Sequence, residues 1–204
     1  MQSITSVAQR SLNKAIIYEG YGAVANATKF VRESESGRLI IIAIGNPSES
    51  LATAIGLVDE GIELIEFCGY IPLIWKVKVA EAIGNRARVS TVTFGIESVV
   101  LAATYNQSFY QGVPPREAFI ILESGSDPIQ DRFEKVFAPQ HTIFIPVPDE
   151  QTGVNVAVEL ADAGYGLIEL YGGFTTIGAA RIIEAVDGRI PVGVGSFTLE
   201  ATKF

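Results

Sequence analysis

The sequence predicts an α/β protein made of two similar halves, each containing four strand–helix units. The first observation is an internal repeat: residues 12–101 and 115–204 align without a gap at an offset of 103 residues, with 21 of 90 positions identical. The second is that apolar runs of strand length alternate with segments of helical period. Because uninterrupted apolar strands are typical of sheets covered on both faces, we expect parallel strands with helices outside them.

The first half provides four expected strands and the helices between them. The clearest helix carries Leu51, Ala54 and Val58 on one face and stops at Gly61. The apolar runs place strands at 14–19, 39–45, 63–68 and 88–94. The periodic segments place helices at 48–61, 73–85 and 96–110, with a weaker helix at 23–35.

The second half repeats this order, as an old duplication would. The best-matched block pairs GIELIEFCGY (61–70) with GYGLIELYGG (164–173). Strands are expected at 118–123, 142–147, 166–171 and 190–197. Helices are expected at 152–164 and 176–188, with a weaker one at 127–138. The aligned Arg86 and Arg189 follow helices, so we expect them to bond carbonyl groups at helix C-termini.

Eight strand–helix units predict, as the first choice, a small (βα)8 barrel of the TIM type closed by the two halves. The alternative is two doubly wound parallel-sheet halves related by a pseudo-two-fold axis. The barrel is favoured because each half alone leaves exposed sheet edges. In both cases residues 1–204 are treated as one domain made of the repeats 12–101 and 115–204.

Composition excludes several classes of function. Asp and Glu outnumber Lys and Arg by 23 to 15, giving a net charge of -8, so a nucleic-acid partner is not expected. The single cysteine and single histidine argue against a disulfide framework and against a His- or Cys-rich metal site. We expect no metal and no cofactor. No apolar run reaches the length of a membrane helix, so a cytoplasmic protein without membrane contact, possibly a homo-oligomer, is expected.

Two repeat-matched glutamates are the candidate catalytic groups. Glu66 and Glu169 lie inside apolar strands, and the alternation along each strand directs both toward the expected barrel mouth. Burial should raise their pKa values, which would allow acid–base chemistry at neutral pH, with Tyr171 orienting the substrate. The alternative is that each glutamate is a core brace bonded to backbone amides or an arginine.

A glycine-rich stretch after the third and fourth strands of the second half is the candidate ligand-binding loop. Backbone amides beside a helix N-terminus bind anions in many parallel α/β folds. The candidate residues are Gly172, Gly173, Thr175, Thr176, Gly195 and Ser196. The aligned positions of the first half do not keep this pattern. Turn glycines with positive φ are the alternative explanation.

The second half resembles a family of prokaryotic α/β domains of about 100 residues and unknown function. The residues that carry the resemblance are Leu167, Ile168, Glu169, Gly172, Gly173 and Phe174, then Glu184, Ala185, Val186, Pro191, Val192, Gly193 and Val194. The first half departs from this pattern, with Tyr70, Ile71 and Trp75 where the second has Gly173, Phe174 and Gly178. The resemblance implies a tandem arrangement of two such units and no particular reaction.

Two functions of different classes are therefore expected. The first is a metal-independent lyase, isomerase or cyclase acting on a small, possibly anionic, molecule. The second is a non-catalytic ligand-binding or assembly protein in which the glutamates are structural. A solvent-reachable pocket containing both glutamates would favour the enzyme, and full burial against backbone donors would favour the scaffold.

Overall fold

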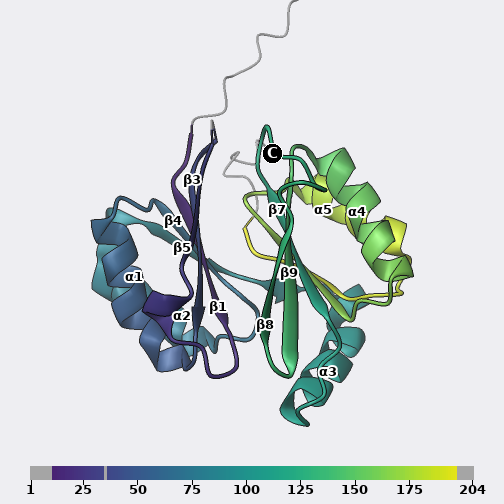
Figure 1. The fold of residues 1–204 in the computed structure, drawn as a ribbon, viewed down its shortest axis with the longest axis horizontal. Helices are drawn as coiled ribbons and strands as arrows, with labels where there is room; N and C mark the ends of the chain where they lie inside the picture. Colours follow the sequence, from purple (N-terminus) through teal and green to yellow (C-terminus); the bar gives the residue numbers. More distant parts are fainter. Residues whose placement is uncertain (1–10, 35, 197–204) are drawn as a thin grey trace, which may run out of the picture.

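Two β-sheets pack face to face, and helices cover the outer face of each (Figure 1). The computed structural model describes residues 11–34 and 36–196. The first half consists of β1 (Lys14–Glu19), β2 (Phe30–Ser34), β3 (Gly37–Ile44), α1 (Ser50–Asp59), β4 (Leu64–Phe67), α2 (Leu73–Ile83) and β5 (Arg88–Thr91). It is followed by β6 (Thr93–Phe94) and α3 (Ile96–Tyr110). The second half consists of β7 (Glu117–Leu122), β8 (Phe133–Phe137), β9 (Gln140–Val147), α4 (Glu150–Asp162), β10 (Leu167–Tyr171), α5 (Thr176–Val186) and β11 (Val192–Val194).

The strand orders confirm the duplication. The first sheet has the order β2-β3-β1-β4-β5, and the second repeats it as β8-β9-β7-β10-β11, with β6 added at the β11 edge. Within each half the central strands are parallel and the second strand of the half is antiparallel. The strand β6 therefore leaves its own half and pairs antiparallel with β11 of the other.

The prediction of a closed (βα)8 barrel is wrong for the described residues, because their strands form two separate sheets. The weaker helices expected at 23–35 and 127–138 are the reason. The last part of each segment is instead a five-residue antiparallel strand, β2 or β8, that forms a hairpin with the next strand. A hairpin strand ends a sheet at its edge, whereas barrel closure needs another parallel strand there.

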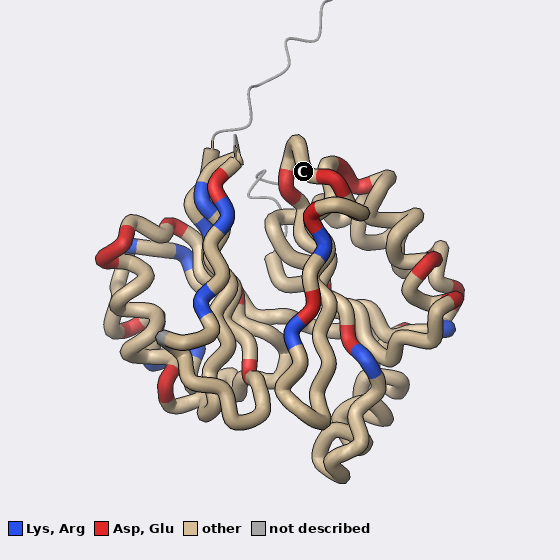
Figure 2. The backbone as a smooth tube through the Cα atoms, viewed as in Figure 1, with Lys and Arg blue, Asp and Glu red and all other residues tan. Residues whose placement is uncertain are grey.

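The two-half alternative fits this arrangement, with one difference. A doubly wound sheet has helices on both faces, but here α1 and α2 cover the outer face of the first sheet, α4 and α5 cover that of the second, and α3 lies at one end of the sandwich (Figure 1). The inner faces are covered by the other sheet, which explains why the strands are apolar on both sides. The hairpin strands β2 and β8 also carry charged residues, in addition to those on the outer helices (Figure 2).

Aromatic side chains fill the space between the sheets. Phe119 of β7 lies at the centre, with its ring centroid 5.6 Å from that of Tyr18, 5.1 Å from that of Phe144 and 5.0 Å from that of Tyr171. Nearby, Phe30 and Phe133 occupy equivalent positions in the repeat and stack with centroids 4.1 Å apart. These rings join the two halves in one hydrophobic core.

Matching polar contacts also recur in both halves. Arg86 donates to the Ile83 carbonyl at the end of α2, and Arg189 donates to the Val186 carbonyl at the end of α5. This confirms the expectation that the two arginines bond carbonyls at helix C-termini. Each arginine also pairs with an aspartate of the preceding helix of its half.

Candidate active site

The two sheets pack with their parallel strands running in opposite directions. Lys14, which begins β1, donates from Nζ to the Leu122 carbonyl at the end of β7, at 2.8 Å. At the other end of the sandwich, Gln140, which begins β9, donates from Nε2 to the Glu19 carbonyl at the end of β1, at 2.9 Å. The carboxyl ends of the two sets of strands therefore lie at opposite ends of the molecule, and they do not form the single mouth expected of a barrel.

Each repeat-matched glutamate bonds the glycine beyond the matching strand of the other half. The Gly172 amide donates to Glu66 Oε2 at 3.1 Å, and the Gly69 amide donates to Glu169 Oε1 at 3.0 Å. Glycines 69 and 172 are themselves separated by the repeat offset of 103. Such reciprocity is what a two-fold relation produces, and both glutamates join the halves across the inter-sheet core.

Glu169 is held in a nearly dry environment. Its side chain is buried, and the Tyr171 hydroxyl donates to its Oε2. Burial and, to a smaller extent, the nearby Glu117 raise the pKa of Glu169 to about 8, although the bonds from Tyr171 and Gly69 act in the opposite direction. Glu169 therefore holds a proton at neutral pH.

Glu117, which begins β7, is the second carboxyl at this end. Its Oε2 accepts a bond of 2.6 Å from the Tyr105 hydroxyl of α3. Its Oε1 accepts bonds from Gln140 Nε2, at 2.7 Å, and from the Thr142 hydroxyl. Burial raises the pKa of Glu117, and these three donors lower it. The donors favour the ionised form of Glu117 beside a protonated Glu169.

A small cavity lies beside these groups. Its volume is about 20 Å³, enough for about one water molecule. Both Glu117 and Glu169 line it, together with Cys68 and Tyr105, whereas Glu66 does not. The thiol of Cys68 has its pKa raised by burial and by Glu169, so it is an inert thiol rather than a nucleophile.

A larger pocket adjoins the cavity on its outer side. It has a volume of about 300 Å³, at the lower end of the range for small-molecule sites. Phe109 and Gln140 line both spaces and so form the boundary between them. We call this larger space the vestibule. Its other lining residues are Tyr21, Tyr110, Gly112, Pro114 and Pro139.

Glu66 lies in a different environment at the other end. Its Oε1 accepts a bond of 2.5 Å from the Ser196 hydroxyl. Burial raises the pKa of Glu66, while Ser196, the Lys14 charge and the Gly172 amide lower it. Lys14 occupies the repeat position that Glu117 holds in the second half. The two halves have therefore diverged, because Glu66 lies near a lysine and Glu169 lies near a second glutamate.

The residues of the predicted anion-binding loop already have protein partners. The Thr175 amide and hydroxyl donate to the carboxylate of Glu150, and the Thr175 hydroxyl caps α5 by accepting from the Gly178 amide. The Gly172 amide and Ser196 hydroxyl donate to Glu66, and the Gly195 amide donates to the Leu170 carbonyl. Gly173 has a positive φ and Thr176 is exposed at the start of α5. An added anion would have to lie beside two carboxylates here.

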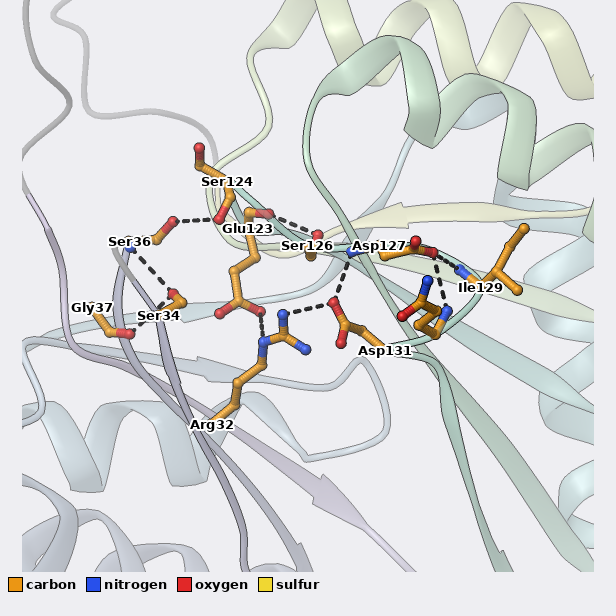
Figure 3. Close-up of polar contacts among 11 residues, drawn as sticks. Arg32, Ser34, Ser36, Gly37, Glu123, Ser124, Ser126, Asp127, Ile129 and Asp131 are labelled. Carbon is orange, nitrogen blue, oxygen red and sulfur yellow. Dashed lines mark hydrogen bonds and ion pairs between the residues drawn. The ribbon is translucent and has the colours of Figure 1, made fainter.

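A further charged cluster joins the β2–β3 hairpin to the connection between β7 and β8 at this end (Figure 3). Arg32 of β2 pairs through Nε with Glu123 at 3.2 Å and through Nη2 with Asp131 at 2.7 Å. Glu123 is 1% exposed, so Arg32 neutralises a buried carboxylate across the two halves. The Ser36 hydroxyl, which donates to the Ser124 carbonyl, adds a second link between the same hairpin and the same connection.

Sequence reasoning missed Lys14, Tyr105, Glu117 and Glu150. Lys14 and Glu117 begin strands, and the beginning of a strand is far from the site in a barrel. Because the sheets run in opposite directions, the first residue of one strand meets the end of another. The offset of 103 residues pairs Lys14 with Glu117, and this charge difference at matched positions was the available signal.

Two searches of the described part of the chain gave negative results. No group of three or more His, Cys, Asp or Glu residues there is arranged to hold a metal ion. None of the helices in that part has both the length and the apolar character needed to cross a bilayer.

Comparison with known proteins agrees with the repeat. No curated protein matches the chain. One family model matches it twice, over residues 12–107 and 115–203, and that family is described as a family of unknown function, DUF6506. The first match covers the first sheet with α1 and α2, and also β6 and most of α3, and the second match covers β7 to β11 with α4 and α5. The chain therefore belongs to the family of unknown function DUF6506 and carries two tandem copies of its domain of about 100 residues.

Proposed function

We propose that the protein is an acid–base enzyme of the lyase, isomerase or cyclase class that acts on a small organic molecule. The observation that carries this proposal is that two buried carboxyl groups, Glu117 and Glu169, line the same cavity. A buried carboxyl group is costly, and perturbed pairs of this kind are concentrated at functional sites.

The two carboxyls are suited to opposite roles. Glu169, with a pKa of about 8, carries a proton at neutral pH and acts as the general acid. Glu117 is assigned as the general base, because its bonds from Tyr105, Gln140 and Thr142 favour the ionised form and oppose the burial that raises its pKa. Tyr171 does not line the cavity, so it is a positioning residue that holds the Glu169 carboxyl through its hydroxyl.

Access comes from the vestibule. The cavity itself holds only about one water molecule, so the body of a substrate would occupy the vestibule and its reacting end would pass Phe109 and Gln140. Both carboxyls lie beyond that boundary, where exclusion of water strengthens electrostatic interactions.

The proposal is tested first without a substrate. The carboxyl carbon of Glu169 in ¹³C-labelled protein should titrate near pH 8, and Glu169→Gln identifies its signal. A midpoint near 4.5 would remove the general acid and overturn the proposal. Glu66→Gln is the matched control, because Glu66 is equally buried but does not line the cavity.

Turnover is tested next, with a panel of small metabolites followed by ¹H NMR. Glu169→Gln and Glu117→Gln should each reduce turnover by about 10² to 10⁴, the usual contribution of a positioned acid or base. Glu66→Gln should leave turnover unchanged. Equal losses in all three variants, accompanied by equal losses of melting temperature, would contradict a catalytic role.

The second candidate function is a non-catalytic binding or assembly protein. The reciprocal bonds of Glu66 with Gly172 and of Glu169 with Gly69 favour it, because a brace accounts for both glutamates. A brace predicts that Glu66→Gln and Glu169→Gln destabilise the fold alike, by about 1–3 kcal/mol. It also predicts that ligand binding survives in both variants.

A further inference from the structure

We propose that the ligand of the cavity and vestibule is an organic cation: an amine or quaternary ammonium group on a flat apolar body. This inference rests on the proposed site, and it replaces the possibly anionic substrate expected from the sequence. It follows from the charges of the lining residues, the aromatic walls and the position of one partly exposed carboxyl.

The charges that line the two spaces at neutral pH are negative. The cavity is lined by Glu19 and Glu117, together with Glu169, which holds a proton and adds no charge, and no Lys or Arg is among the lining residues of either space. Lys14, at the other end of the sandwich, lines neither of them. A carboxylate ligand would be repelled here and would lose its hydration without compensation, whereas a cation would be attracted.

The walls are aromatic. The Tyr70 ring lies with its centroid 4.1 Å from that of Phe109 and 5.6 Å from that of Tyr110, so the three rings form one surface at the entrance. At the vestibule, Tyr21 is 66% and Tyr110 is 82% exposed, which is unusual for such large rings. Exposed ring faces beside carboxylates attract ammonium groups through cation–π interactions and pack against a flat apolar body.

Glu19 is the third carboxyl that lines the cavity. It ends β1, it is only partly buried, and Gln140 of the boundary bonds its carbonyl. Unlike Glu117 and Glu169, Glu19 has no place in the proposed acid–base pair. Its charge can therefore be removed without altering that pair.

The test compares three probes that share a phenyl ring and differ in charge. Binding of phenethylamine, 2-phenylethanol and phenylacetate is measured by titration calorimetry at pH 7 and about 0.15 M salt. Phenethylamine should bind about tenfold more tightly than the alcohol, with phenylacetate the weakest. Equal affinities, stronger binding of phenylacetate, or no binding of phenethylamine would overturn the inference.

Variants locate the bound probe. Tyr110→Leu keeps an apolar wall but removes the ring, and Glu19→Gln removes one charge; each should reduce the preference for the amine severalfold and leave 2-phenylethanol binding unchanged. Glu81→Gln, an exposed change on α2, is the control. Unchanged amine binding in both Tyr110→Leu and Glu19→Gln would show that the amine binds elsewhere and would overturn the inference.

The binding results can be interpreted independently of whether the acid–base proposal holds. The amine preference is measured without turnover, and it should persist in Glu169→Gln. If Glu169 titrates near 4.5 but the amine preference holds, the acid–base proposal fails and the cation site stands. If Glu169 titrates near pH 8 but phenylacetate binds best, the cation site fails and the acid–base proposal stands.

Discussion

Replacing Glu169 with glutamine should make the stability of the protein less dependent on pH. Burial raises the pKa of this carboxyl from 4.5 to about 8 in the folded protein. Between those values the folded state keeps a proton that the unfolded chain releases, so the free energy of unfolding falls as pH rises, by about 1.4 kcal/mol per pH unit. This contribution is fully present below pH 4.5 and is lost by about pH 8, with a total near 5 kcal/mol.

Glutamine imitates the protonated acid. Its carbonyl can accept from the Gly69 amide, and its amide can donate to the Tyr171 hydroxyl oxygen. The variant should therefore match the wild type within about 1 kcal/mol at pH 5. At pH 8.5 it should be more stable by several kcal/mol. Glu66 and Glu117, whose pKa values are also raised by burial, keep part of the pH dependence in the variant.

Urea unfolding at a series of pH values measures this difference. Far-UV circular dichroism follows the helices, and the fluorescence of Trp75 follows α2. The exposed change Glu81→Gln should leave the pH profile parallel to that of the wild type. If Glu169→Gln also gives a parallel profile, Glu169 is ionised in the folded protein and the reasoning from burial is refuted.

Three further predictions concern the fold and the glycine-rich loop. Gly172→Ala should cost about 3 kcal/mol, because φ is +87° and a Cβ would lie 2.5 Å from a backbone oxygen of β7. The control Gly112→Ala, at a glycine with φ +76° and open space around it, should cost about 1 kcal/mol. If chemical denaturation gives equal losses of unfolding free energy for both variants, the close approach of Gly172 to β7 is contradicted. Phe119→Ala should lower the unfolding free energy by about 3–5 kcal/mol, whereas the control Val136→Ala, at an exposed position, should lower it only slightly. A small effect of Phe119→Ala would mean that the aromatic rings do not join the two halves. Phosphate at tens of millimolar should not raise the melting temperature, because carboxylates such as that of Glu150 already occupy the loop amides; a rise in a thermal shift assay would restore the anion site.

The sequence predicted the elements best where the hydrophobic pattern is long. The helices expected at 73–85 and 176–188 correspond to α2 and α5, and the central strands of both halves lie within about two residues of their expected bounds. The hairpin strands β2 and β8 were missed. Each strand is only five residues long, and part-buried and exposed residues alternate in β2 but not in β8, so neither strand could be distinguished from a weak helix.

The candidate site shows the same division between local and distant information. Alternation along the strand predicted that Glu66 and Glu169 face inward, and both are buried on the inner faces. Their partners were not predictable, because the Gly172 and Gly69 amides come from the other half, about 100 residues away. The carboxyl pair was missed because Glu117 and Glu169, although both in the second half, approach each other only through the pairing of β7 with β10 in the second sheet.

By itself, the sequence determined the duplication, the α/β class and the burial of two matched glutamates. These follow from the repeat offset and from apolar periodicity, which are properties of neighbouring residues. Only the tertiary structure decided that the halves form two opposed sheets instead of one barrel, and that Glu169 shares a cavity with Glu117 while Glu66 faces Lys14. The physical reason is that the inner faces of both sheets are apolar and aromatic. Packing them on each other buries that surface without closing a barrel, and the relative direction of the sheets then sets which charges meet.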